Sequence, residues 1–130
     1  MYCLDTDFLV AWLRKNEEAH AFAERLQLEH VELCSTPISL TELFYGFHLN
    51  GKEDEREVLE ELASSLGLLA FDSLAASIAG KTMAALQKSG TPIGDADAMI
   101  AALALRHNQT LVTRNLKHFG RIPNLKVAEW

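Results

Sequence analysis

Several acidic residues of this chain stand where carboxylates commonly do chemistry. The stretch "LDTDFLV", residues 4–10, places Asp5 and Asp7 directly after a short apolar start. Further along, Glu42 opens a predicted helix, and Asp95 and Asp97 begin a strongly apolar one. In a parallel sheet these positions would meet at one edge, because ligands of such sheets bind beyond the carboxyl ends of the strands.

Carboxylates that converge at one edge need a counter-charge. Two of them about 4 Å apart repel by about 4 kcal/mol at an effective dielectric constant of about 20, so protonation or a divalent cation must neutralise the group. Aspartate and glutamate oxygens, with Asn115 just past a predicted strand, suit Mg²⁺ or Mn²⁺ better than zinc. Such ions lower the pKa of bound water and stabilise charge on a phosphate, so the expected chemistry is phosphodiester hydrolysis.

The same acids also have structural explanations. "SLTE", residues 39–42, has the pattern of a capping box, in which Ser39 caps a helix and Glu42 reaches back to it. Asp95 is a natural N-cap after Gly94. Since one cap suffices, and since Asp97 directly precedes a wholly apolar run, we weight Asp97 toward function.

The residues of the first motif can also be assigned either a structural or a chemical role. Either Thr6 or Asp7 could cap the first predicted helix, because both have a side-chain oxygen that can accept a backbone N–H. Asp5 lies at the end of the predicted strand and then has no capping role. We therefore expect the Asp5 carboxylate to be part of the site.

Alternating strand and helix patterns must position these residues. Strands are predicted at residues 2–5, 31–36, 68–71, 110–113 and 125–130. Helices are predicted between them, at residues 8–15, 17–30, 37–49, 52–66, 73–87 and 95–107. This alternation indicates an α/β fold in three layers: one domain over residues 1–130, with a short parallel β-sheet and helices on both faces.

Length and composition agree with that interpretation. The chain has 130 residues, 48% of them hydrophobic, which suits one globular core. No apolar run approaches the ~18 residues of a membrane span and no signal segment opens the chain, so we expect a cytoplasmic protein. Cys3 and Cys34 show no metal-ligand spacing and are expected to be buried, reduced thiols.

Charge is distributed unevenly along the chain. Residues 1–65 contain 14 acidic and 5 basic residues, whereas residues 66–130 contain 4 acidic and 7 basic ones. From residue 106 onward only Glu129 opposes a basic strip, formed by Arg106, Arg114, Lys117, Arg121 and Lys126. The strip could hold a polyanion, although an unevenly charged solvated surface explains it equally well.

Four segments together resemble a known family. They are "LDTDFLV", "PISLTELFYG", "IGDADAMIAALAL" and "LVTRNLKHFGRIPNLKVAEW", in this order and spacing. They are similar to the PIN-domain ribonucleases of VapC-type toxin–antitoxin pairs, from the first strand to the last residue. The resemblance implies a PIN-like fold and a Mg²⁺- or Mn²⁺-dependent endoribonuclease that cleaves structured cellular RNA such as tRNA or rRNA. It also implies a VapB-type antitoxin partner and, commonly, a homodimer.

The resemblance also implies roles for particular residues. Asp5, Glu42 and Asp97 match the acids that bind the metal and carry catalysis in the family. Asn115 falls where many relatives have a fourth acid, which leaves a second metal position open. Asp7 stands where asparagine is frequent and is expected to support the site.

Four further residues are expected near the site or its substrate. Thr113, beside Asn115 at a strand end, is expected to orient a ligand. Arg114 and Lys117 are expected to contact the RNA backbone. Asp95 remains a supporting residue as the presumed cap. His118 is expected at the surface, with an RNA contact as the less favoured role.

Two other functions remain open at this level. "LDTD" also suggests a phosphatase of the haloacid dehalogenase type, in which Asp5 would form an aspartyl-phosphate, but such enzymes need a downstream lysine near a further acidic pair. The pair formed by Asp95 and Asp97 has no lysine close in sequence. The second alternative is a catalytically degenerate PIN fold that only binds a partner, and the intact acids disfavour it.

Overall fold

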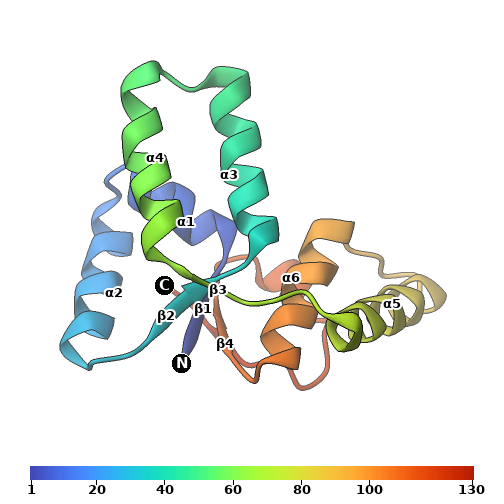
Figure 1. Ribbon diagram of the computed structural model, residues 1–130. Coiled ribbons are helices and arrows are strands. Elements are labelled where there is room, and N and C mark those ends of the chain that lie inside the picture. The colour runs from blue at the N-terminus through green and yellow to red at the C-terminus, as the bar shows by residue number, and fades with distance from the viewer.

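Five short parallel strands form the sheet. The computed structural model describes residues 1–130 and places the strands in the order β3, β2, β1, β4, β5 (Figure 1). Their bounds are Tyr2–Leu4 (β1), Leu33–Ser35 (β2), Gly67–Leu68 (β3), Thr110–Val112 (β4) and Val127–Ala128 (β5). β1 is central, because Cys3 pairs with Cys34 of β2 on one side and with Leu111 of β4 on the other. The predicted parallel α/β architecture is confirmed.

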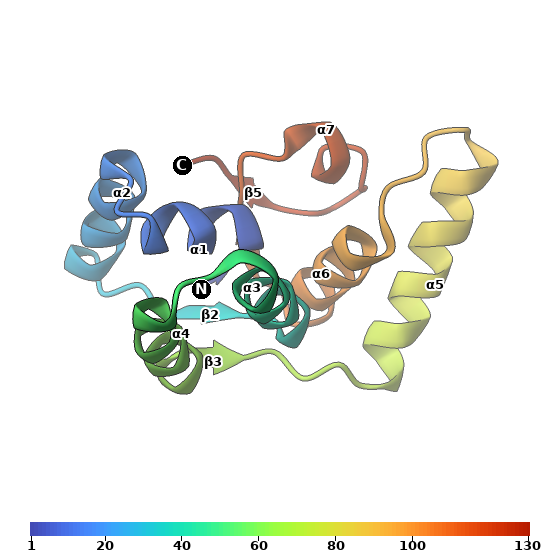
Figure 2. The same ribbon diagram turned by 90° about the horizontal axis from the view of Figure 1, so that it is seen from above.

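Seven helices connect the strands. They are Thr6–Leu13 (α1), Glu17–Leu28 (α2), Pro37–Asn50 (α3), Glu53–Ser65 (α4), Ser73–Lys88 (α5), Asp95–Arg106 (α6) and Leu116–Phe119 (α7). The pair α3 and α4 projects from the sheet as an arm, and α5 lies beside α6 at the other end of the molecule (Figure 1 and Figure 2). The single-turn helix α7 adds to the predicted set. None of the helices is long and apolar enough to cross a membrane.

Each face of the sheet has its own core. Side chains alternate along a strand, so Cys3 and Leu111 face a cluster with α5, α6 and α7, whereas Leu4 and Val112 face a cluster with α1 to α4. The predicted helices on both faces are thereby confirmed. Burial in the first cluster holds α6 in place, since each fully buried large apolar side chain, such as Leu103, contributes about 2 kcal/mol.

The two cysteines lie opposite each other in the central strands. Cys3 of β1 and Cys34 of β2 are partners in the sheet register, and both are buried. They form no disulfide, as predicted. The Cys34 thiol instead donates to the Tyr2 carbonyl oxygen at 3.4 Å. Both residues therefore act as core side chains that support the strands leading to the site.

Helix α3 begins earlier than the predicted capping box requires. Its N-cap is Thr36, whose Oγ1 accepts the Ser39 N–H at 2.9 Å, and Pro37 is the first helical residue. Proline is favoured at that position because its φ is preset and its missing N–H would have no helical partner. The prediction of Ser39 as the cap is therefore wrong, and Glu42 is free of a capping role.

The predicted caps of α1 and α6 are also wrong. Asp5 occupies the N-cap position of α1, so Thr6 and Asp7 already lie in its first turn, and the Asp5 side chain makes no capping hydrogen bond. Gly94 is the N-cap of α6, and Asp95 is the first helical residue. Both aspartates of the first turn of α6 still gain from the positive end of the helix dipole.

An ion pair ties α6 to α5 at the end opposite the acids. Asp72 caps α5 by accepting the Ala75 N–H at 2.9 Å and pairs with Arg106 Nη2 at 2.9 Å. The hydrogen bond from Arg106 lowers the pKa of Asp72 to about 2, so the pair stays ionised into strongly acidic solution. Arg106 is thereby engaged within the protein and is no longer a free member of the basic strip.

Candidate active site

Asp5 lies at the centre of the acidic edge, directly after β1. Only 4% of its surface is exposed, and its backbone N–H donates to the Val112 carbonyl oxygen at 3.0 Å. That bond continues the pairing of β1 with β4 and fixes the backbone from which the carboxylate extends. The side-chain oxygen Oδ2 accepts the Thr113 hydroxyl at 2.7 Å. Adjacent central strands therefore hold Asp5 rigidly.

The charge of Asp5 is unfavourable in this position. Burial raises the pKa of Asp5 to about 7; the hydrogen bond from Thr113 opposes this rise, and the charges of Asp7 and Asp97 add to it. A carboxylate that resists ionisation because it is buried among other carboxylates is typical of functional sites. The site as built therefore has an excess of negative charge.

Thr113, directly after β4, connects several groups of the site. Besides donating to Asp5, its Oγ1 accepts the Asn115 N–H at 3.0 Å and lies 3.3 Å from Asp7 Oδ2. The residue is fully buried, so the hydroxyl has no water to replace these partners. Thr113 thus contacts Asp5, Asp7 and Asn115, and its role in orienting a ligand stays a prediction.

Replacing Thr113 with valine should lower the free energy of unfolding by about 2 kcal/mol, because valine keeps the shape but leaves buried polar groups of Asp5 and Asn115 without a partner. Thr113→Ser keeps the hydroxyl and is the matched control, which should lose less. Urea denaturation of the metal-free proteins measures both. A valine variant as stable as the serine variant would contradict the role assigned to the hydroxyl.

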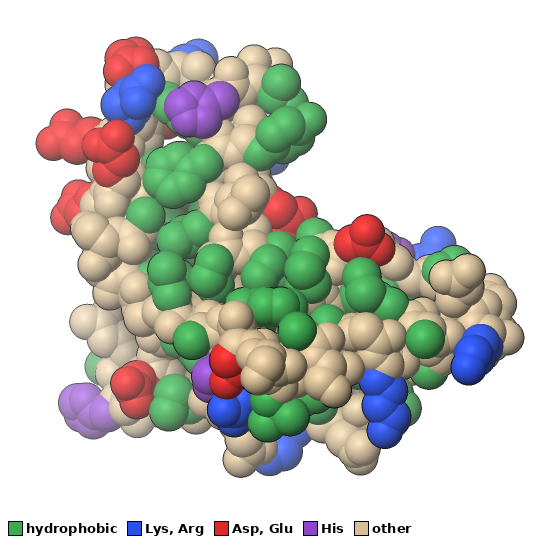
Figure 3. All heavy atoms as spheres, turned by 45° about the vertical axis from the view of Figure 1, so that its right-hand side comes forward, with side chains coloured by type: hydrophobic (Ala, Val, Ile, Leu, Met, Phe, Trp, Pro, Cys, Tyr) green, Lys and Arg blue, Asp and Glu red, His purple; other side chains and the backbone are tan.

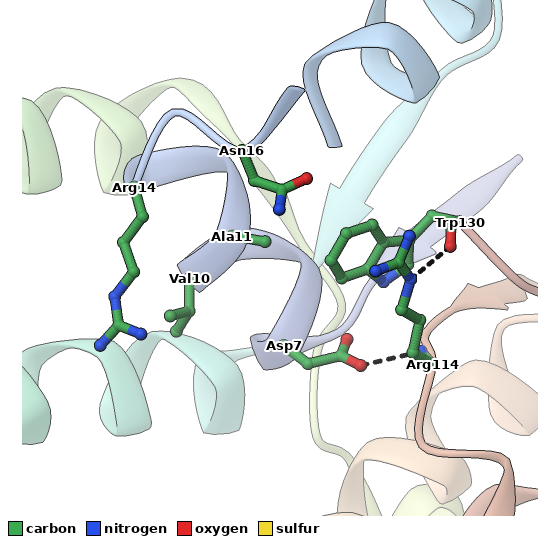
Figure 4. Close-up of a pocket in the computed structure, with 7 residues that line it drawn as sticks. All are labelled: Asp7, Val10, Ala11, Arg14, Asn16, Arg114 and Trp130. Carbon is green, nitrogen blue, oxygen red and sulfur yellow. Dashed lines mark hydrogen bonds between the residues drawn. The ribbon is translucent and has the colours of Figure 1, made fainter. Parts of the chain in front are cut away.

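Asp7 extends from the first turn of α1 toward the segment after β4. Its Oδ2 accepts the Arg114 backbone N–H at 2.8 Å (Figure 4). Its other oxygen, Oδ1, is buried and has no hydrogen-bond partner. A buried carboxylate oxygen without a donor is rare and costly, which marks Asp7 as part of the uncompensated negative charge.

Asp97 projects from the first turn of α6 and meets the segment around α7. Its Oδ2 lies 2.6 Å from His118 Nδ1 and 3.2 Å from Asn115 Nδ2. The expectation that His118 is merely a surface residue is therefore wrong. Asn115 and His118 are three residues apart at α7, a spacing that places side chains on one helix face, and that spacing is the signal in the sequence that could have identified His118.

Glu42 reaches the site from the second turn of α3. Its Oε1 accepts the Thr6 hydroxyl at 2.7 Å, next to Asp5 in the chain. Glu42 itself is exposed, unlike Asp5. Hydrogen bonds thus connect Asp97 to Asp5 through Asn115 and Thr113, whereas Glu42 is bonded only to Thr6, the residue after Asp5 in the chain.

The chemistry of this donor set suits a divalent cation. Asp5, Asp7, Glu42 and Asp97 all present oxygen, and no lysine or arginine side chain forms an ion pair with any of them. In the present arrangement no three histidine, cysteine or acidic side chains form a group that could enclose a metal ion. The orphaned Asp7 oxygen and the raised pKa of Asp5 nevertheless indicate a local excess of negative charge, which a cation would offset. Oxygen ligands of this kind suit Mg²⁺ or Mn²⁺. It stays a prediction that Asp5, Glu42 and Asp97 bind one ion together.

The remaining predicted residues lie around the acids rather than among them. Asp95 and Lys117 are exposed and form no side-chain hydrogen bond. The Arg114 guanidinium is engaged by Glu18 and by the Trp130 carbonyl oxygen, and it lies 3.7 Å from the centre of the Trp130 ring. Arg114 and Trp130 line one side of a hollow of about 560 Å³, and Asp7 also lines it (Figure 4).

A five-stranded parallel sheet with carboxylates gathered at its carboxyl edge is the arrangement of a PIN domain. The family model of the PIN domain matches residues 2–125, so the chain belongs to the PIN-domain family. Within that family it belongs with the VapC proteins. It is 35% identical over 130 residues to the tRNA(fMet)-specific endonuclease VapC of Salmonella typhimurium, which covers 99% of this chain and 97% of the relative.

Solved structures of VapC proteins share the whole fold. The VapBC2 complex of Rickettsia felis, bound to a DNA fragment from its promoter, contains a chain that matches with a TM-score of 0.89 at 32% identity and covers 99% of this chain and 98% of that one. The DNA-bound VapBC of Salmonella typhimurium matches with a TM-score of 0.88 at 33% identity, with coverage of 99% and 97%. Both are toxin–antitoxin complexes, so the predicted family is confirmed.

Proposed function

We propose that this chain, as one nuclease domain over residues 1–130, is an endoribonuclease toxin that hydrolyses phosphodiester bonds of structured RNA with Mg²⁺ or Mn²⁺. The observation that carries the proposal is the interacting set of Asp5, Asp7 and Asp97 at the carboxyl edge of the sheet, to which Glu42 is linked through Thr6, and none of these acids has a lysine or arginine partner. The name of the Salmonella typhimurium relative, a tRNA(fMet)-specific endonuclease, supports RNA as the substrate. The cytoplasm, where such RNA is found, is the proposed location.

Asp5, Asp97 and Glu42 would hold the cation, with Asp7 as a supporting acid. When bound, the cation supplies a Lewis acid for the phosphate charge and lowers the pKa of water. Thr113 keeps Asp5 oriented through its 2.7 Å hydrogen bond, and Asn115 is bonded to both Thr113 and Asp97. The protein's share of catalysis is therefore to fix the carboxylate oxygens that would hold the cation, without a protein nucleophile.

The RNA backbone would pass the acids on the side of α7 and the hollow. Lys117 is exposed on α7, and its side chain has no partner within the protein. Arg114 carries the adjacent positive charge but would have to exchange Glu18 for a phosphate. The wall of the hollow adds the exposed Arg14. These three cations offset the repulsion between RNA and an acidic protein.

The arm is proposed to receive the VapB-type antitoxin. Its large apolar residues Tyr45, Leu49 and Val58 are exposed to 67%, 59% and 48%. Hydrophobic side chains also gather over the arm and in the angle between the arm and the rest of the molecule (Figure 3). Exposed apolar surface of this extent is typical of a partner site. A homodimer is proposed as the assembly of the toxin itself.

Metal removal tests the proposed reaction. The purified, antitoxin-free protein should cut a folded tRNA or rRNA at a few internal positions, lose this activity in EDTA, and regain it with Mg²⁺ or Mn²⁺. Ca²⁺ should not restore activity, because its looser coordination binds a phosphate without aligning it. End-mapping of the fragments on sequencing gels measures the outcome.

The control for a contaminating nuclease is an Asp97→Asn protein purified in parallel, which should leave the RNA intact. If the wild-type protein with Mn²⁺ leaves all cellular RNA intact but releases inorganic phosphate from small esters, the phosphatase alternative replaces the proposed function. If neither substrate is turned over, the chain is a degenerate PIN fold that only binds a partner.

A further inference from the structure

Two side chains at α7 hold one oxygen of Asp97. His118 Nδ1 lies 2.6 Å and Asn115 Nδ2 lies 3.2 Å from the same atom, Oδ2. We call Asn115 and His118 the Asp97 clamp. The side chains of Asp97 and His118 are 22% and 34% exposed, so their hydrogen bond is partly shielded from water.

The chemistry of the groups fixes which atoms donate. An ionised carboxylate only accepts, so the hydrogen between the two residues belongs to His118 Nδ1. A nitrogen that donates this hydrogen cannot also accept from Asn115 Nδ2, which lies 3.3 Å away, and the amide hydrogens of Asn115 are left for Asp97. Oδ2 therefore receives two donors, whereas Oδ1 of Asp97 receives no hydrogen bond from the protein.

The backbone that carries the Asp97 clamp is anchored to the rest of the protein. Phe119, the last residue of α7, is fully buried in the core on the α6 side of the sheet. Its N–H donates to the Asn115 carbonyl oxygen at 3.1 Å, and the Asn115 N–H donates to Thr113 Oγ1 at 3.0 Å. The backbone of the clamp is therefore anchored both to the core and to the residue that orients Asp5.

We propose that His118 is a positioning residue, which with Asn115 fixes the Asp97 carboxylate so that Oδ1 stays available to the divalent cation. The proposal rests on the proposed function and extends it to a residue outside the acidic set. A carboxylate that is already fixed loses less rotational freedom when it ligates an ion, and removal of such supporting partners typically weakens metal binding by about 10- to 100-fold.

Mn²⁺ affinity, measured on the full chain without RNA by calorimetry and by the electron paramagnetic resonance of free Mn²⁺, tests the proposal. His118→Ala should weaken binding by about 10-fold. His118→Asn should bind almost as tightly as the wild type, because the asparagine amide nitrogen occupies the place of Nδ1 and can donate. His48→Ala removes an exposed imidazole from the end of α3 and should leave the affinity unchanged.

Other outcomes would decide against the proposal or against the proposed function. An unchanged or tighter Mn²⁺ affinity of His118→Ala, even with a lower melting temperature, would show that His118 serves folding alone. An asparagine variant as weak as the alanine variant would show that donation at this position is not the cause. Failure of the wild-type protein to bind Mn²⁺ would also overturn it, whereas Mn²⁺ binding without RNA cleavage would overturn the proposed function only.

Discussion

An Asp5→Asn protein should lose RNA cleavage by about 10³-fold or more and yet be more stable than the wild type in alkaline solution. The loss of activity is expected because removing one ligand charge removes several kcal/mol of stabilisation of the phosphate charge. The gain in stability is expected because Asp5 is buried beside other acids, where a neutral amide is easier to accommodate. Thr113 can still donate to the asparagine oxygen.

The sign of the stability change follows from the two pKa values. The pKa of Asp5 is about 7 in the folded protein, raised chiefly by burial, and about 3.9 in an unfolded chain. Between these values the folded protein keeps a proton that the unfolded chain has lost. The stability of the metal-free wild type therefore falls as the pH rises from about 4 to about 7, by up to about 4 kcal/mol. Asparagine at position 5 abolishes this contribution.

Urea denaturation in EDTA at pH 5 and at pH 8.5 measures the effect. The difference in free energy of unfolding between Asp5→Asn and the wild type should be larger at pH 8.5, because only the wild type then carries the unfavourable buried charge of Asp5. A difference that does not change with pH would contradict the unfavourable ionisation of Asp5. Mn²⁺ should stabilise the wild type and have little effect on the variant.

The second large effect is expected within α6, where two acids lie two positions apart. Asp97→Asn should abolish cleavage, by about 10³-fold or more, because Asp97 belongs to the acidic site and faces the clamp. Asp95→Asn is the matched control, with the same chemical change on an exposed residue that is not the N-cap. It should keep most activity. Each variant should lose at most about 1 kcal/mol of stability, from the interaction with the helix dipole.

Cleavage assays and thermal melts of the two variants separate the roles. If Asp95→Asn were inactive and Asp97→Asn active, the assignment of the pair would be reversed. If both were inactive but folded, the first turn of α6 would act as a unit, and the exposed position of Asp95 would have to change when RNA binds.

The fold was predictable because its signals are periodic and local. Alternation of strand and helix patterns predicted the parallel sheet, and the apolar run after Asp97 correctly predicted the buried helix α6. The starts of α3 and α6 were predicted correctly, but the predicted N-caps were wrong by one to three residues, because Thr36, Gly94 and Asp5 took the N-cap positions. Several cap residues compete near each start, and only the path of the preceding strand decides between them.

The sequence placed the candidate acids at the edge of the sheet, but it did not reveal which side chains contact each of them. Asp5 and Asp97 follow from their positions at a strand end and a helix start. Thr113 lies 108 residues from Asp5 in the chain and His118 lies 21 residues from Asp97. Contacts over such separations depend on the order of the strands, which no local pattern contains. His118 was missed for this reason, although its spacing from Asn115 was visible.

The central position of β1 has a consequence for synthesis on the ribosome. β1 is synthesised first, but it cannot pair with β4 until the chain has been extended past Thr110, where β4 begins. A nascent chain therefore carries Asp5 for most of its translation without Thr113 or the segment that holds Asp97. Chains start to fold while they are being made, but fragments from interrupted translation lack the assembled acidic edge. Only a nearly finished chain can assemble the site that the proposed activity requires.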